Sequence, residues 1–385
     1  MDFELFQFET GIKLIPARLK EAREAKCFTM TELASLVDVT PSAISAFEAD
    51  IKQPEWNTLM RISDKLEQPI SFFTTGRPEG GEPTATAFFR SFKSRRKIYN
   101  KMLRRWSVWA AQFAKYVGTM VNLPPVEIPE VEYKLEHSED EIEIIATNCR
   151  RLWGLADGPI ANMVALLESR GFIVIRSEFR VSDIDAFSCW QDNRPYIFLA
   201  TDKNCAVRSR FDAAHELGHM ILHRHLSQDQ VEDGDILNQI EREANRFAAA
   251  FLLPAKTFVS EIYSSNLRQF ISLKSRWKVA MAAMIYRCKD LGVFDERQYI
   301  NLRKQMSFEG IIKHEPLDDT IAIEQPQIIS QCVKLIAASS IKQATDFVLD
   351  LHLSAKSLAA LAGCPESVFT DEKTNPDIYP LALKQ

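Results

Sequence analysis

Two histidines and a glutamate at fixed spacing are the residues of this chain best suited to chemistry. Positions 215–219 read HELGH, the H-E-x-x-H pattern. Residues four apart share one face of a helix, so His215 and His219 can offer two imidazole nitrogens to one metal ion. Glu216 is one position further on and points past such an ion, where its carboxylate could act as a general base toward water. The pattern alone also occurs by chance on soluble helices.

A second helical segment, about twenty residues further along, could supply a third ligand. Apolar residues recur at helical spacing over 240–253, and a proline follows. A catalytic zinc site usually has three protein ligands and leaves the fourth position open. Glu241 and Glu243 both qualify by position. Glu241 is preferred because Asn245 then lies one turn further along the same face, where it could hold a ligand histidine by its second ring nitrogen. Glu243 is expected to face solvent.

These two segments resemble the ImmA/IrrE metallopeptidases. The resemblance is carried by HELGH at 215–219, by LH at 222–223, by EREANRFA at 241–248 and by LLP at 252–254. It implies Zn²⁺ as cofactor, held by His215, His219 and Glu241 in the gluzincin manner, with Glu216 as the catalytic base. Better-studied members inactivate a transcriptional repressor by proteolysis, so the implied partner is a repressor or antitoxin encoded nearby. His223 matches a family position but is expected to be structural.

The elements that must position these residues are expected within residues 139–310. Helical patterns cover 140–154 and 158–171, and strands are expected at 172–176, 186–190 and 196–200, with a hairpin turn at 192–193. Helices around a small, mostly antiparallel sheet indicate an α+β, zincin-like domain. A further helix is expected at 275–292. Its Tyr286 is a candidate for steadying an oxyanion, although a core position is the preferred interpretation.

Residues 1–76 read as short amphipathic helices and resemble a Cro/CI-type helix-turn-helix domain. Thr40 and Pro41 would start the helix that enters the major groove. Its outward residues would be Ser42, Ala43, Ser45 and Ala46, none of which makes strong bidentate base contacts. Residues 1–80 hold nine Lys and Arg against thirteen Asp and Glu, a net charge of 9 − 13 = −4, so phosphate attraction from this part is weak. Segment 30–48 could bind DNA or contact a protein partner.

Residues 77–138 are expected to form a linker and a long helix. The turn-rich sequence around 76–83 reads as the linker. Positions 90–105 contain eight basic residues and no acid, which could contact phosphates or face an acidic surface of this or another protein. Aromatic residues follow at positions 106, 109, 113 and 116, and they are expected to be core residues rather than base-stacking ones.

Residues 311–385 are expected to form a C-terminal helical region. Positions 356–369 echo positions 31–44, with leucines, an alanine and a serine in register. The echo could mark a second helix-turn-helix-like unit, although a plain helical hairpin is favoured.

Length and composition limit the number of domains and the class of protein. A chain of 385 residues with 46% hydrophobic content should form two or three packed domains. We expect no membrane span and no secretory signal, and seven scattered cysteines are typical of reduced thiols in a cytoplasmic protein. The sequence therefore predicts a multidomain protein: an all-α helix-turn-helix domain, an α+β zincin-like metallopeptidase domain and a C-terminal helical region. The alternative function is a DNA- or partner-binding regulator, or a toxin–antitoxin component, whose metal site is structural or vestigial.

Overall fold

The computed structural model describes residues 13–76, 86–89, 97–132, 134–178, 185–201, 205–227, 230 and 233–370. It divides into two units, each built from separate stretches of chain. The first unit contains Met1–Ala85, Ser94–Leu123 and Gln327–Gln385, and the second contains Thr86–Lys93 and Pro124–Pro326. Domain boundaries were expected after residues 76, 138 and 310. The units change elsewhere because the long helix and the C-terminal helices of the first unit pack with its N-terminal helices, which local patterns do not reveal.

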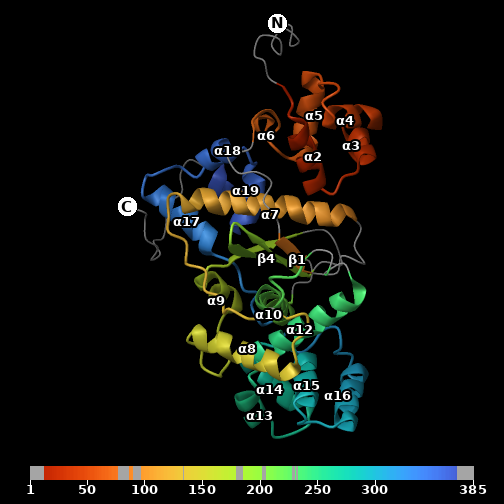
Figure 1. Ribbon diagram of the computed structural model, residues 1–385, viewed down its shortest axis with the longest axis vertical. Coiled ribbons are helices and arrows are strands. Elements are labelled where there is room, and N and C mark those ends of the chain that lie inside the picture. The colour runs from red at the N-terminus through yellow and green to blue at the C-terminus, as the bar shows by residue number, and fades with distance from the viewer. Residues whose placement is uncertain are drawn as a thin grey trace. The chain divides into compact units, whose positions relative to one another are not determined.

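Two of the N-terminal helices of the first unit begin at threonine caps, and the cap at Thr40 was expected. Thr29 forms a capping box with Glu32, and the Thr40 side chain accepts a hydrogen bond from the Ala43 backbone with Pro41 following it. Buried side chains, including Ile44 at 0% exposure, hold the helices together. The helices are α2 (Pro16–Ala25), α3 (Met30–Leu36), α4 (Pro41–Glu48), α5 (Trp56–Leu66) and α6 (Ile70–Thr74), as Figure 1 shows.

The long helix α7 (Lys97–Gly118) lies against α2 and buries the expected aromatic stripe. Trp109 and Phe113 are 2% and 1% exposed, and Trp109 Nε1 donates to Glu21 Oε1 at 2.6 Å. The expectation that the four aromatics are core residues is therefore confirmed at these two positions, whereas Trp106 and Tyr116 are half-buried. The same unit contains α17 (Ile328–Ala338), α18 (Asp346–Leu351), α19 (Ala355–Ala362) and the 3-10 turn η1 (Glu366–Phe369).

The C-terminal segment that resembles the helix-turn-helix sequence forms only the first of the two helices that such a unit would have. Ser354 caps α19, and Gly363 ends it with a φ of 67°. A single 3-10 turn then takes the place of a second full helix. The segment is therefore neither a second helix-turn-helix unit nor a regular helical hairpin within the described residues. Its contacts lie within the first unit, where Gln68 Nε2 donates to Ser357 Oγ at 2.8 Å.

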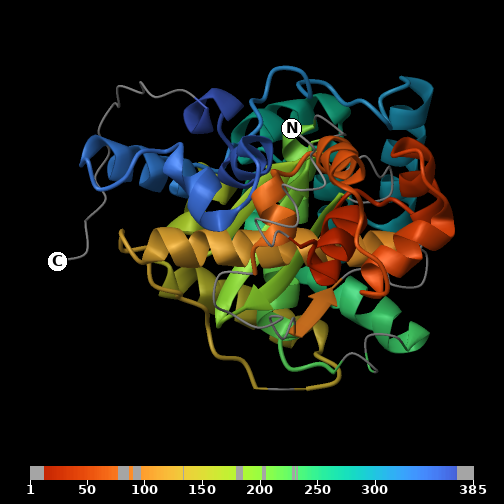
Figure 2. The ribbon, with the colours of Figure 1, turned by 90° about the horizontal axis from the view of Figure 1, so that it is seen from above.

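The second unit contains a sheet with strand order β1-β3-β4-β2. Its strands are β1 (Thr86–Phe89), β2 (Ile173–Ser177), β3 (Ala186–Gln191) and β4 (Arg194–Ala200). β3 and β4 are antiparallel and joined by the expected two-residue turn, in which Asp192 and Asn193 have φ of 49° and 61°. β1 pairs antiparallel with β3, and β2 runs parallel to β4. Figure 2 shows the green strands of this sheet side by side.

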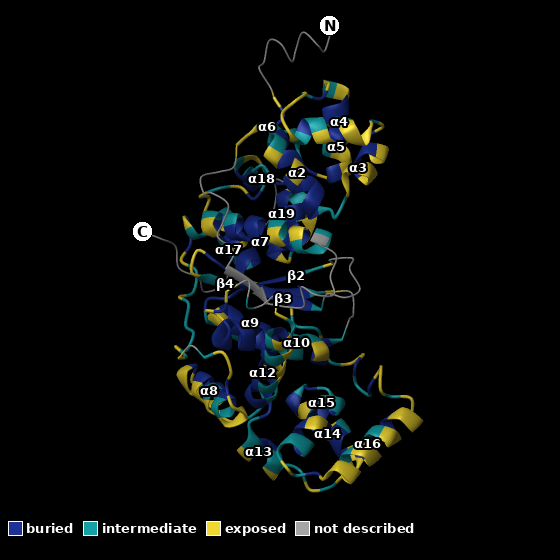
Figure 3. Cartoon of the chain, turned by 45° about the vertical axis from the view of Figure 1, so that its right-hand side comes forward, coloured by how far each residue is buried: buried dark blue, intermediate teal, exposed yellow. Residues whose placement is uncertain are grey.

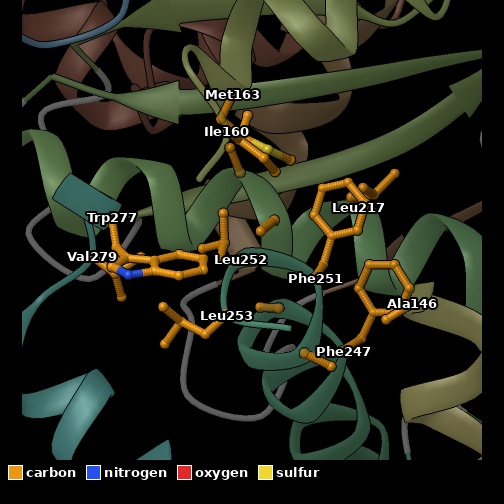
Figure 4. Close-up of a cluster of buried hydrophobic side chains, with 14 of the residues drawn as sticks. Ala146, Ile160, Met163, Leu217, Phe247, Phe251, Leu252, Leu253, Trp277 and Val279 are labelled. Carbon is orange, nitrogen blue, oxygen red and sulfur yellow. The ribbon is translucent and has the colours of Figure 1, made fainter. Parts of the chain in front are cut away.

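The helices of the second unit enclose a buried apolar cluster. They are α8 (Glu139–Leu152), α9 (Met163–Ser169), α10 (Ala206–Leu222), α12 (Gly234–Leu252), α13 (Ala255–Ser260), α14 (Leu267–Trp277), α15 (Met281–Asp290) and α16 (Glu296–Phe308). Phe247 and Phe251 of α12 stack with their ring centroids 5.7 Å apart, and Leu217 of α10 and Trp277 of α14 belong to the same cluster (Figure 4). α16 is exposed along much of its length (Figure 3). The α+β architecture agrees with the expectation.

The helix expected over 275–292 is wrong as a single element. Lys278 has a φ of 53°, in the left-handed region, and ends α14. Val279 is fully buried, and α15 begins at Met281. The burial pattern is continuous through this break, which is why helical periodicity concealed it. In the part of the chain that the structure describes, no helix is both long enough and apolar enough to span a bilayer. All seven cysteines are free thiols.

Candidate metal centre

Gly218 lets the two helices of the candidate site approach each other closely. A Cβ at this position would lie 3.2 Å from Ala244 Cα and 3.2 Å from Phe247 Cβ, both on α12. Such distances are tighter than ordinary van der Waals contact, so a side chain here would push α12 away from α10. Since Glu241 lies one turn before Ala244, the glycine is what allows its carboxylate to reach the histidines of α10.

The three side chains expected to hold a metal converge. His215 Nε2 and His219 Nε2 are 3.0 Å apart. The Glu241 carboxylate lies 3.3 Å from His215 Nε2 and 3.5 Å from His219 Nε2. All three ligand atoms fall within 4.8 Å of one another. The histidines are buried, and the Glu241 side chain is 26% exposed.

The partners of the other ring nitrogens determine where the imidazole lone pairs point. Asn245 Oδ1 lies 3.0 Å from His215 Nδ1, as its position one turn after Glu241 predicted. An amide oxygen can only accept, so Nδ1 carries the proton and Nε2 carries the lone pair. His219 Nδ1 is 2.9 Å from His223 Nδ1, whose ring donates through Nε2 to Glu243 Oε2 at 3.2 Å. His219 Nδ1 is therefore also the donor, and its Nε2 also carries a lone pair.

This arrangement fits a divalent cation. Two nitrogen lone pairs facing each other at 3.0 Å repel unless a positive charge lies between them. Glu241 Oε1 is buried and has no hydrogen-bond donor among the described residues. Burial lowers the pKa of His219 to about 3, which keeps its ring neutral, as a metal ligand requires. Two neutral imidazoles and one carboxylate are the donor set of many zinc sites.

Glu216 lies on the side of α10 that faces the sheet. Its side chain is fully buried, and Glu216 Oε2 accepts a hydrogen bond of 2.6 Å from Ser188 Oγ of β3. The strand therefore fixes the orientation of the carboxylate next to His215. Ser188 was not anticipated from the sequence, because a serine in a buried strand carries no signal of its own until the strand is docked on α10.

The helix-turn-helix region presents small side chains at the expected positions. Ser42 and Ser45 of α4 are exposed, and Ala43 and Ala46 are half-buried. Ile44 and Phe47 between them are buried and anchor the helix. The outward face of α4 is therefore accessible but offers no long hydrogen-bonding side chain at these four positions.

Comparison with known families identifies both regions. Residues 167–289 match the model described as the IrrE N-terminal-like domain of M78 peptidases. Residues 19–73 match a helix-turn-helix model, so the two domains follow each other in the expected order. No curated protein matches the chain. The matched ranges lie inside the expected segments 139–310 and 1–76.

The burial of Glu243 in the peptidase domain differs from the expectation. Glu243 was expected to face solvent, but it is 5% exposed and accepts hydrogen bonds from His137 and His223. The signal that could have found it is the spacing of His215, His219 and His223, which puts three histidines on one face of α10. His137 precedes α8 in sequence, and no local pattern connects it to this site. His225 is exposed.

Tyr286 of the peptidase domain is not the core residue that was preferred. It is 56% exposed, and its ring packs edge-on against Tyr299 at a centroid distance of 6.2 Å. The buried apolar residues of α15 are Met281, Met284, Ile285 and Cys288, which recur at helical spacing, and Tyr286 lies off this face.

The basic stretch 90–105 is partly satisfied inside the first unit. Positions 90–96 lie outside the described residues, as do linker positions 77–83. In α7, Arg105 lies 2.8 Å and Lys101 3.4 Å from Glu24 of α2, which is 3% exposed. Of the two interpretations given for this stretch, pairing with an acidic group of the same protein holds for these two cations.

Proposed function

We propose that this chain is a zinc-dependent peptidase that cleaves a transcriptional repressor or antitoxin encoded nearby. The observation that supports it best is the convergence of His215 Nε2, His219 Nε2 and the Glu241 carboxylate on one point. The family match supports the peptidase reaction class. The nature of the substrate is taken from the resemblance of residues 215–254 to repressor-cleaving peptidases.

In this mechanism His215, His219 and Glu241 hold the ion, and Asn245 and His223 keep the two rings in the required tautomer. A bound Zn²⁺ supplies Lewis-acid chemistry, polarising a peptide carbonyl and acidifying water. Glu216 takes a proton from the attacking water and delivers it to the leaving amine. Ser188 donates to Glu216 and keeps its carboxylate aligned beside His215.

We further propose that α4 binds DNA through its exposed face, with Ser42, Ala43, Ser45 and Ala46 nearest to the bases. The match of residues 19–73 to a helix-turn-helix model supports this role. In the full chain, Ser45→Glu should abolish retention of promoter DNA in a mobility-shift assay, and Asn57→Glu, at an exposed position of α5, should not. Cleavage should be unchanged in both variants. Equal DNA binding by both would contradict a DNA-reading role for α4.

The alternative is a regulator in which zinc is only structural. The burial of the site favours it, because His219 and Glu216 are both 0% exposed and structural zinc sites are closed to solvent. In that case the metal would stabilise the fold, and the chain would act by binding DNA or a partner.

The two functions are separated by incubating the zinc-loaded protein with the repressor-type protein encoded next to it. The peptidase reading requires one defined cut by the wild type and none by Glu216→Gln, although that variant still binds one zinc ion. Asp235→Asn, at an exposed position of α12, is the matched control and should cut normally. Cutting by Glu216→Gln at the wild-type rate would contradict the mechanism. A wild type that binds zinc and cuts nothing would favour the regulator.

A further inference from the structure

A buried polar cluster lies beside the candidate metal ligands, and only its His223 enters the mechanism above. It consists of His137, which precedes α8, His223 at the end of α10, and Glu243 of α12. Their exposed fractions are 6%, 2% and 5%. Burial of a carboxylate and two imidazoles is costly unless each is hydrogen-bonded, so the cluster calls for a physical explanation.

Glu243 accepts four hydrogen bonds. Its Oε1 accepts from the His137 backbone N–H at 3.2 Å and from Gln239 Nε2 at 2.9 Å. Its Oε2 accepts from His137 Nδ1 at 3.1 Å and from His223 Nε2 at 3.2 Å. Both oxygens are thus occupied as acceptors, which is the arrangement of an ionised carboxylate.

These contacts fix the direction of every hydrogen bond that leads to the metal ligand. Because the carboxylate only accepts, His223 Nε2 must donate, and the neutral His223 ring accepts at Nδ1. His219 Nδ1, 2.9 Å away, must then donate, which leaves the lone pair on His219 Nε2. With the opposite tautomer, His219 Nε2 would carry a proton and could not bind a cation.

We propose that Glu243, His223 and His137 form a positioning network for the metal ligand His219, and that this network raises the affinity of the peptidase domain for its divalent ion. The inference rests on the metal site of the proposed function. Hydrogen-bond partners behind a ligand histidine fix its tautomer and ring orientation. Through His137, these hydrogen bonds also connect the segment before α8 to helix α10, which carries His219.

The cluster itself is not assigned as a second metal site. Among the described residues, the three-residue group whose ligand atoms lie close enough to hold an ion is His215, His219 and Glu241. Glu243 Oε2 is shared by two ring nitrogens that each donate to it, so neither nitrogen presents a lone pair there. The geometry therefore points to an orienting function.

The experiment measures metal affinity in Glu243→Gln. Gln at this position can turn its amide toward His223 Nε2 and donate, which would reverse the tautomers of His223 and His219. We expect the apo-protein, titrated with Zn²⁺ in competition with a chromophoric chelator, to bind about tenfold more weakly than the wild type. The visible absorption spectrum of the Co²⁺-substituted protein should also change, because it reports the ligand geometry at the ion.

Glu315→Gln is the matched control. Glu315 is also 5% exposed and hydrogen-bonded, but to Lys274 and the start of α15. This variant should lower the unfolding temperature of the apo-protein and leave zinc affinity and the Co²⁺ spectrum unchanged. His137→Ala is a second variant at the far end of the network. It keeps the bond between His223 and Glu243, so its loss of affinity should be smaller than that of Glu243→Gln.

Each outcome is decisive. The proposal is overturned if Glu243→Gln binds Zn²⁺ like the wild type and differs only in apo-protein stability, as the control does. If Glu243→Gln does not fold, His137→Ala decides by the same titration, and unchanged affinity in that folded variant overturns the proposal. A wild type that binds no divalent metal would instead contradict the proposed function, together with the network that depends on it.

Discussion

Ser188 Oγ on β3 donates a hydrogen bond of 2.6 Å to Glu216 Oε2 on α10. Both residues are 0% exposed, so water does not compete for this bond. The sheet and the helix that carries the candidate catalytic carboxylate are thereby connected at the carboxylate itself. The orientation of Glu216 relative to His215 thus depends on the docking of β3.

Ser188→Ala should lower kcat about tenfold with little change in KM, since a hydrogen bond to a charged group contributes roughly 1.5–3 kcal/mol and its loss frees the carboxylate to rotate. Zinc content should stay at the wild-type value, because none of the ligand atoms is touched. Steady-state kinetics on the cleaved partner, together with metal analysis, check this. An unchanged kcat would mean that β3 does not orient Glu216.

Gly218→Ala should weaken zinc binding even though alanine is the better helix former by about 1 kcal/mol. The new Cβ would meet the backbone of α12 at Ala244, which cannot rotate away as a side chain can. Separation of α10 from α12 then moves Glu241 away from the histidines. Competition with a chelator measures the affinity, and Gly234→Ala at the start of α12 is the control. If Gly218→Ala binds zinc like the control, close helix approach is not what brings the carboxylate into place.

Lys274→Met should destabilise the protein by about 3–5 kcal/mol at neutral pH, because it leaves buried carboxylates without their cation. Lys274 is 0% exposed and lies 2.8 Å from Glu315 and 2.5 Å from Asp318. Chemical denaturation measures the loss. Lys289→Met, which removes a surface pair with Glu296, is the control and should have little effect.

The loss of folding stability in Lys274→Met should also depend on pH. Burial raises the pKa of Asp318, but hydrogen bonds from Lys274 and the Glu315 backbone outweigh it and hold that pKa below its ordinary value of 3.8. The stabilisation is therefore present above about pH 4 and lost as the pH falls through the lowered pKa. The stability difference between wild type and variant should shrink in acid. A difference that is constant down to pH 3 would rule out this coupling.

Arg105→Ala should destabilise the first unit by about 1–3 kcal/mol, since Glu24 is 3% exposed and would keep only the longer contact to Lys101. The salt dependence of DNA binding should change little, because Arg105 is engaged within the protein. Lys115→Ala, at an exposed position of the same helix, is the control for both readouts. If the dependence of DNA affinity on salt concentration became clearly weaker in Arg105→Ala but not in Lys115→Ala, Arg105 would instead contact DNA.

Local patterns were sufficient where one helix or one turn decides the outcome. The cap at Thr40, the turn at Asp192 and Asn193, and the shared helix face of Glu241 and Asn245 all follow from residue type and spacing. The reach of Asn245 to His215 follows in turn, because it requires only that the two helices pack.

Features that depend on distant parts of the chain could not be predicted in this way. Glu243 is buried because His137, over a hundred positions earlier, closes over it. The basic helix α7 is partly neutralised by Glu24, whose place on the buried face of α2 depends on α7 itself. In each case, the partner that decides burial is remote in sequence.

The most direct test of the central claim is anomalous diffraction at the zinc edge from crystals grown with one equivalent of Zn²⁺. The account predicts one peak bounded by His215 Nε2, His219 Nε2 and the Glu241 carboxylate, and no peak at that position in Glu241→Gln. A peak held instead by His223, Glu243 and His137, or a peak retained in full in the variant, would contradict it.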